Sequence, residues 1–259
     1  FVGQPFTFAF AQVGTNCGLV GQNACVEVDG SAYWMSENGF FRYAGKLESL
    51  PCLVEDHVYD DINLDSGNQM VSAGLNNLFG EVMWFYPTST SSVVNRMVCF
   101  NYFDSSPQRP VWTVGTLART MWEDSAIFGS PHALEYDAAT DTSFDVVGNT
   151  EGRTTYYQHE TGTDQVKGGT VTAITANITS GDFDITQRIV GNQMTGIADF
   201  RGDGEHLMKI RRFIPDFVSQ TGNTRITLNL RNFPNDTSAS SSLGPFDISS
   251  STQKVDTRA

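Results

Sequence analysis

Short runs of alternating apolar and polar side chains, separated by turn residues, fill the first part of the chain. The earliest runs predict strands at residues 24–28, 31–35 and 40–43. Asp29-Gly30 and Asn38-Gly39 lie between them, and such dipeptides supply the positive φ angles that two-residue hairpins require. We therefore predict three antiparallel strands joined by two tight turns.

Two later groups of runs repeat this organisation. They predict strands at residues 81–86, 96–102 and 111–114, and then at 133–137 and 151–160. Residues 29–39 and 151–162 also share a pattern, in which an acidic-Gly turn precedes a short aromatic strand and a second turn. Repeated units of three or four antiparallel strands favour β-propeller-like blades. The alternative is a β-sandwich whose hairpins resemble one another by chance.

One helix is predicted, at residues 53–63. Val54, Val58 and Ile62 are spaced four apart, so they form one apolar face. We expect this helix to lie between two blades. The acidic residues of the segment are Glu55, Asp56, Asp60 and Asp61.

Composition and charge divide the chain in two. Aromatic residues make up 12% and charged residues 17%, which is typical of β-structure. Residues 1–165 carry 6 basic and 20 acidic side chains, whereas residues 166–259 carry 10 basic and 9 acidic ones. We predict acidic blades over 1–165 and a near-neutral β-rich segment over 166–259. In the latter we expect strands at 170–178, 207–213 and 225–230, and a serine-rich loop at 237–242.

The net charge of −13 and the apolar pattern exclude two classes of protein. With a pI of about 4.5, the chain lacks the basic surface of a nucleic-acid-coating protein. It contains no run of 18 apolar residues, so we predict no membrane span. The chain opens at Phe1 without a signal-peptide pattern, and we expect it to be a piece of a longer polypeptide.

Cysteine and histidine residues show no metal-binding or catalytic spacing. No CxxC pair occurs, and the four histidines stand alone, so we predict neither a zinc site nor any cofactor. The cysteines are predicted to be free, mostly buried thiols, which favours a reducing compartment without deciding it. There is no GxSxG, Walker or HExxH motif either. The cysteines lie at 17, 25, 52 and 99.

Paired carboxylates are the one catalytic pattern to weigh, since propellers include glycosidases that use two acids. Nothing in their spacing marks one carboxyl group as an acid with a raised pKa. Acidic turns and a solvated helix face explain them more simply, and we predict that the chain is not an enzyme. The candidates are Asp56, Asp60, Asp61, Glu123 and Asp124.

Several short aromatic-rich motifs carry a resemblance to a known family. They are AYWMSENGFF (32–41), LPCLVED (50–56), DDIN (60–63), EVMWFYP (81–87), GTLART (115–120), IRRFIPDF (210–217) and VDTRA (255–259). In these segments the chain resembles structural proteins of short-tailed bacteriophages, namely the tail nozzle (tail tubular) and packaged-DNA-stabilisation proteins. The resemblance runs from about residue 25 to the end of the chain and includes no catalytic motif.

That resemblance implies a propeller-containing subunit of the virion tail, assembled in the cytoplasm of the bacterial host. Such a subunit would form a homo-hexameric tube beside the tail adaptor and the tail fibre or spike proteins. The tube would retain packaged double-stranded DNA and conduct it during ejection, without sequence-specific binding. An acidic wall would keep DNA from adhering, although the same charge also serves solubility. Separately, we predict that Glu55, Asp56, Asp60 and Asp61 form a lumen or subunit contact.

The alternative function is a receptor- or glycan-binding propeller on a phage tail, with glycan hydrolysis as a variant of that alternative. It would use exposed aromatic rings as stacking platforms, and the candidates are Trp34, Trp84 and Trp122. Trp34 and Trp84 lie within alternating strands, which favours a place in the core for both.

Overall fold

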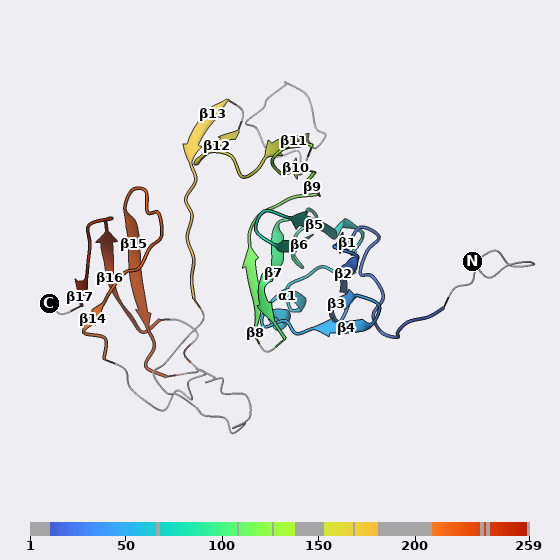
Figure 1. Cartoon of the computed structure of the whole chain (residues 1–259), viewed down its shortest axis with the longest axis horizontal. Coiled ribbons are helices and arrows are strands. Elements are labelled where there is room, and N and C mark those ends of the chain that lie inside the picture. The colour runs from blue at the N-terminus through green and yellow to red at the C-terminus, as the bar shows by residue number, and fades with distance from the viewer. Residues whose placement is uncertain are drawn as a thin grey trace, which may run out of the picture. The chain divides into compact units, whose positions relative to one another are not determined.

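A computed structural model of the chain describes residues 11–65, 68–107, 109–125, 127–137, 153–167, 169–180, 209–233, 236 and 239–257. The regular secondary structure of the described chain is almost entirely antiparallel strand, which confirms the predicted all-β class (Figure 1). It divides into a first unit, Phe1–Thr175, and a second unit, Ala176–Ala259.

The first sheet is a four-stranded meander. Its strands, in spatial as well as sequence order, are β1 (Cys25–Val28), β2 (Ser31–Ser36), β3 (Gly39–Tyr43) and β4 (Leu47–Leu50). The three predicted strands are confirmed. The sequence analysis missed β4 because its two central residues are both polar, so the segment shows no alternation.

The two tight turns of this sheet differ from each other. Asp29 and Gly30 both have positive φ, 48° and 77°, as predicted for an Asp-Gly hairpin. The prediction is wrong at Asn38, which keeps a negative φ, and Gly39 takes φ 143° instead. The Tyr59 hydroxyl holds this second turn, since it accepts a hydrogen bond from the Gly39 N–H (3.0 Å) and donates one to the Ser36 carbonyl (2.6 Å).

The second sheet is another four-stranded meander, and the third has three strands. The second contains β5 (Ser72–Asn76), β6 (Glu81–Tyr86), β7 (Arg96–Ser106) and β8 (Arg109–Gly115). The third contains β9 (Met121–Glu123), β10 (His132–Asp137) and β11 (Arg153–Gln158). The sequence analysis missed β5, whose only large apolar residue is Leu75, and the three-residue β9. The similar segments 29–39 and 151–162 also occupy different places, since β2 is the second strand of its sheet and β11 the third.

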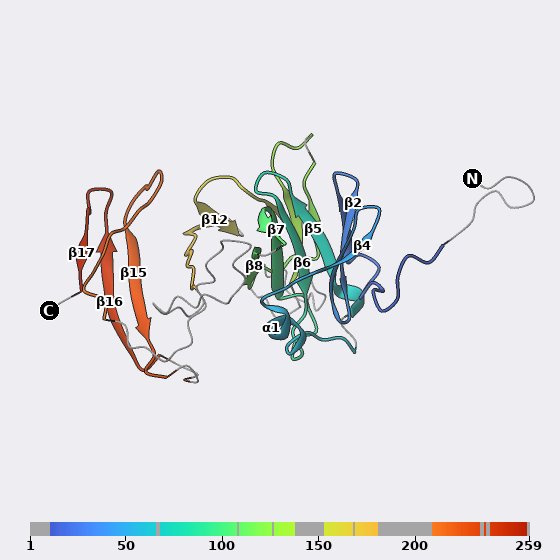
Figure 2. The same cartoon turned by 60° about the horizontal axis from the view of Figure 1, so that its bottom comes forward.

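The second sheet packs between its two neighbours. Val82, Trp84 and Tyr86 of β6 belong to a core shared with the first sheet, which we call the first core. The alternate residues Met83 and Phe85 belong to a second core, shared with the third sheet. Both faces of β6 are therefore covered, and in Figures 1 and 2 the strands of the first two sheets lie side by side.

The first strands of the three sheets are neighbours. β5 contacts both β1 and β9. Just before β1, Asn23 forms a parallel bridge with Ser72, and its carbonyl accepts a hydrogen bond from the Ala73 N–H at 2.8 Å. The three meanders are thus arranged so that β5, the first strand of the second sheet, contacts the first strands of both neighbouring sheets.

Tryptophan indoles tie the sheets together. Each of three indole N–H groups donates to a backbone carbonyl of the neighbouring part of the fold, which satisfies the one polar atom of a buried ring. These bonds are Trp84 to Ala24 (3.0 Å), Trp112 to Pro51 (2.8 Å) and Trp122 to Leu75 (2.9 Å).

The predicted helix is present but shorter. α1 spans Glu55–Tyr59, and a 3-10 turn, η1, follows at Asn68–Met70. Val58 is fully buried and Ile62 is 7% exposed, and both contribute to the first core, so the predicted apolar face is confirmed. The helix ends early because Ile62 bridges to Thr88 and the Asn63 N–H donates to the Pro87 carbonyl.

A hairpin closes the first unit. It consists of β12 (Asp164–Lys167) and β13 (Thr170–Ala173). The structure divides after Thr175, later than the predicted division after residue 165, because this hairpin spans the predicted position. The strand predicted at 170–178 ends at Ala173.

The described part of the second unit contains two two-stranded sheets. They pair β14 (Arg212–Phe213) with β17 (Val255–Asp256) and β15 (Thr224–Leu230) with β16 (Ser241–Ile248). The strand predicted at 225–230 is confirmed. Of the strand predicted at 207–213, only residues 212–213 form a strand, β14, and residues 207–208 lie outside the described part. The predicted serine-rich loop is wrong at its end, because β16 begins at Ser241; residues 237–238 are not described.

Candidate functional site

The four acidic side chains around α1 form two pairs that differ in their exposure to solvent. Asp56 and Asp60 are exposed, whereas Glu55 and Asp61 are half-buried. The Asp61 backbone carbonyl accepts a hydrogen bond from the Ser89 N–H, and its carboxylate accepts a weak one from the Ser89 hydroxyl at 3.4 Å. Asp61 therefore helps to fasten the end of α1 to the chain after β6, and the exposed pair remains available to a partner.

Glu55 faces the turn between β2 and β3. A Cβ added at Gly39 would lie 3.5 Å from a Glu55 carboxylate oxygen. Burial, with a further contribution from the negative charge of Glu55, raises the pKa of the neighbouring Cys52 thiol to about 12. Of the four predicted contact residues, Asp56 and Asp60 are therefore the two exposed ones.

The other two candidate carboxylates, Glu123 and Asp124, lie at the end of β9. Asp124 accepts a hydrogen bond from the Asn77 N–H at 2.6 Å and so fixes the turn between β5 and β6, while Glu123 is exposed on β9. Within the described ranges, no group of three or more His, Cys, Asp or Glu side chains is arranged to hold a metal ion.

The three tryptophans proposed as glycan-stacking platforms are all buried. Trp34 is 9%, Trp84 0% and Trp122 8% exposed. A ring enclosed in this way cannot present a face to a sugar. The core assignment of Trp34 and Trp84 is confirmed, and Trp122 also lies in a core.

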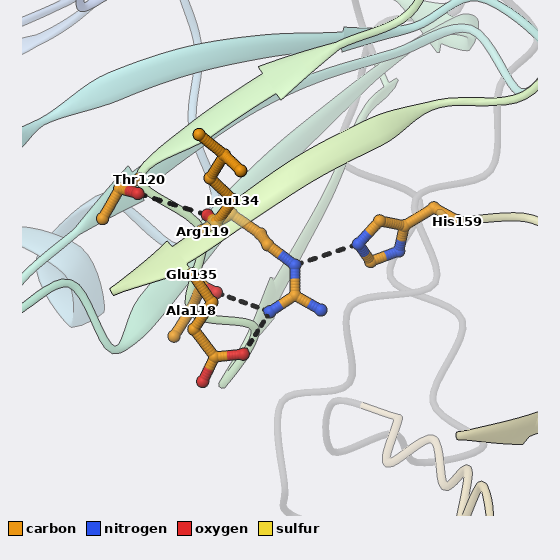
Figure 3. Close-up of polar contacts among 6 residues, drawn as sticks. All are labelled: Ala118, Arg119, Thr120, Leu134, Glu135 and His159. Atoms are coloured by element: carbon orange, nitrogen blue, oxygen red, sulfur yellow. Dashed lines mark hydrogen bonds and ion pairs between the residues drawn. The ribbon is translucent and has the colours of Figure 1, made fainter. Parts of the chain in front are cut away.

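A buried polar cluster centres on Arg119, which is 6% exposed (Figure 3). Its guanidinium donates to the Glu135 carboxylate at 2.9 Å, to the Ala118 carbonyl at 2.6 Å, and to His159 Nε2 at 2.9 Å. The guanidinium carbon also lies 4.2 Å from the centre of the Tyr157 ring. Arg119 thereby joins the segment before β9 to β10, β11 and the residue after β11.

His159 is neutral in this cluster. Burial, and then the positive charge of Arg119, lower its pKa from 6.5 to about 4. A neutral ring is what the geometry requires, because Nε2 accepts the Arg119 hydrogen bond and must carry no proton. The His159 ring also packs against the Trp122 ring, at 4.6 Å between centres.

A second polar cluster, around the buried residue Asn76, joins the second sheet to the chain after β11. The Asn76 side-chain amide, on a residue 2% exposed, donates to Glu81 at 3.2 Å and to Glu160 at 3.3 Å. Burial, and then the Glu160 charge, raise the pKa of Glu81, while the Asn76 hydrogen bond opposes this. Like Arg119, Asn76 escaped the sequence analysis, because an isolated polar residue gives no signal until its partners from distant strands are known.

All four cysteines are free thiols, as predicted. Their predicted burial holds for Cys99, whose pKa burial raises to about 12, but Cys17 and Cys52 are half-buried and Cys25 is exposed. The exposed position of Cys25 follows from its place at the start of β1, where its side chain points away from the first core.

A pocket of about 260 Å³ lies where the first strands begin. Asn23 precedes β1, Ser72 opens β5 and Thr120 precedes β9, so each of the three sheets contributes a lining residue. Gln69 and Tyr136 complete its polar lining together with Ser92. The sequence analysis missed this pocket, because its lining residues come from segments that lie far apart in the sequence.

Neither a protein-family model nor a curated protein sequence matches the chain. In the part of the chain that the structure describes, no helix has the length and apolar character needed to cross a membrane.

Proposed function

We propose that the chain is a structural subunit of a short-tailed phage tail, with the role of a nozzle that holds packaged DNA and conducts it during ejection. The observation that carries this proposal is the succession of meander sheets with adjacent first strands. In a β-propeller, blades follow one another in this way. Closure into a propeller and assembly into a homo-hexamer are parts of the proposal.

The electrostatics support the same role. Residues 1–165 have a formal charge of −14, and Asp56 and Asp60 are exposed on α1. A wall of like charge repels the phosphate backbone, so DNA can slide past without binding. The clusters around Arg119 and Asn76 fit a scaffold, because the Arg119 guanidinium and the Asn76 side-chain nitrogen link segments that are distant in sequence.

Electron microscopy of the purified full-length protein tests the assembly. The expected class averages show a sixfold ring with an open central channel. Monomers or trimers without a channel would contradict the nozzle proposal, since a tube is its basic physical requirement.

Ejection kinetics test the acidic segment. In phage particles assembled with an Asp56→Lys/Asp60→Lys subunit, we expect slower DNA release, because the channel wall would then attract phosphates. The matched control is Asp104→Lys/Asp216→Lys, which makes the same charge change at two exposed acids elsewhere. Equal ejection rates in both variants would contradict the proposal that the α1 acids line the channel. The proposal of a ring assembly would be unaffected by that result.

A further inference from the structure

The pocket at the start of the first strands has a lining that no part of the nozzle proposal uses. Its polar residues are the amides Asn23 and Gln69 and the hydroxyl residues Ser72, Ser92, Thr120 and Tyr136. The rest of its lining is apolar, and none of its lining residues is charged.

This lining selects against charged ligands. A phosphate or a nucleic acid would need arginine or lysine donors, and a divalent cation would need carboxylates. Amides and hydroxyls instead both donate and accept hydrogen bonds, which matches a ligand whose own groups do the same. A neutral, polyhydroxylated molecule meets that description.

The amides and one buried hydroxyl are available for such bonds. The side chains of Asn23 and Gln69 are exposed and form no hydrogen bond with any described residue. Ser72 is 8% exposed, and its hydroxyl oxygen has no partner within the described structure. Thr120 donates to the Leu134 carbonyl at 3.2 Å and keeps its lone pairs for accepting.

Tyr136 adds an aromatic surface. Its side chain lines the pocket from β10, and the residue is 42% exposed. The C–H face of a sugar ring stacks on such a ring, while the sugar hydroxyls meet the neighbouring amides. The volume of about 260 Å³ is just below the usual range of ligand pockets, about 300–1,000 Å³, so it suits one sugar unit rather than a long chain.

We propose that this pocket binds one neutral hexose unit of a glycan. The residues of this site differ from the three buried tryptophans, and the proposal does not depend on the nozzle function. Binding would add surface recognition to the first unit, at the position where its three sheets meet.

Titration of the full-length protein with methyl hexosides tests the proposal. Neutral methyl glucoside, galactoside, mannoside and N-acetylglucosaminide are compared with glucuronate and glucose 6-phosphate by saturation-transfer NMR and calorimetry. We expect at least one neutral sugar to bind and the anions to bind far more weakly. Binding of the anions alone, or of no neutral sugar at tens of millimolar, would overturn the proposal.

Two variants locate the site. Tyr136→Ala should weaken the binding of the neutral sugar about ten-fold, equivalent to about 1.4 kcal/mol. Gln69→Ala, which removes an exposed amide without touching either core, should weaken it as well. Tyr156→Ala is the control, since Tyr156 is an exposed tyrosine of the same sheet that does not line the pocket. Unchanged affinity in both pocket variants, or an equal loss in the control, would place the sugar elsewhere and overturn the proposal.

Discussion

Strand β6 of the first unit and strand β15 of the second show two ways in which a strand can be covered. β6 (EVMWFY) is apolar at all but its first residue, and its last five residues are buried. β15 (TRITLNL) alternates strictly, and its even-numbered residues, from Thr224 to Leu230, are half-buried while those between them are exposed. A continuous apolar run fits a strand covered on both faces, whereas alternation fits one covered face.

The difference extends to the units themselves. The first unit contains two cores, one on each side of the second sheet. In the described part of the second unit, Ile248 is the one buried residue, and both sheets have only two strands. Two-stranded sheets are marginally stable in water without further packing. The first unit is thus held by layers of side chains, and the described second unit by strand pairing and surface contacts.

Matched phenylalanine substitutions give the largest expected contrast. Phe85→Ala empties a fully buried site of the second core and should lower the free energy of unfolding by about 3–5 kcal/mol. Phe233→Ala removes a side chain that is 68% exposed in the second unit. It should change the free energy of unfolding by less than about 0.5 kcal/mol. Denaturant unfolding followed by far-UV circular dichroism, which reports on both units, measures each change. Equal losses would contradict the comparison.

Matched ion-pair substitutions should differ by less. Glu135→Gln weakens the bond to buried Arg119 and should lower the free energy of unfolding by about 1.5–3 kcal/mol. Asp247→Asn weakens the cross-strand pair with Arg225. The two side chains of this pair, Asp247 and Arg225, are 67% and 68% exposed. Water screens exposed pairs of this kind, so we expect no measurable shift of the unfolding midpoint. A larger effect at Asp247 than at Glu135 would show that surface charge pairs stabilise the chain more than the buried cluster does.

Gly74→Ala tests how closely the second and third sheets approach each other. A Cβ added at Gly74 would lie 2.7 Å from the Trp122 Cβ, so the rings of the second core would have to move. We expect a loss of about 1–3 kcal/mol in the free energy of unfolding. Gly18→Ala is the control, because a Cβ there meets no atom within 4 Å. Thermal unfolding of both variants at neutral pH provides the measurement, and equal midpoints would mean that the sheets separate readily.

The pH dependence of stability should show a smaller contribution from His159. Its pKa is about 4 in the folded chain and near 6.5 when unfolded, so between these values the unfolded chain binds more protons. The contribution of His159 is therefore fully present above pH 6.5 and is lost as the pH falls toward 4. In His159→Gln, whose amide oxygen can still accept the Arg119 hydrogen bond, the unfolding midpoint should fall less over this range.

The His159 experiment needs a control variant, and one outcome would contradict the prediction. His57→Gln, at an exposed position of α1, should retain the wild-type pH dependence and serves as the control. If His159→Gln follows the wild-type curve, the lowered pKa of His159 does not contribute to stability, although its ring contacts Arg119 (Figure 3).

The sequence by itself determined the β class, most of the long strands and the apolar face of α1. These features depend on local rules, since side chains alternate across a strand and repeat every third or fourth residue along a helix. The Asp29-Gly30 turn was predictable for the same reason, because its backbone angles depend on two adjacent residues. The short strands β4 and β9 and the sparse strand β5 carry too few apolar residues to give such a signal.

Only the tertiary structure decided which residues meet. Arg119, Glu135 and His159 lie up to 40 positions apart in sequence, and the pocket collects residues from the starts of β1, β5 and β9. The early end of α1 likewise follows from backbone bonds to Pro87 and Thr88, which no local pattern contains. Polar contacts of this kind depend on how whole sheets stack, and the stacking is set by the summed burial of many apolar side chains rather than by any one segment.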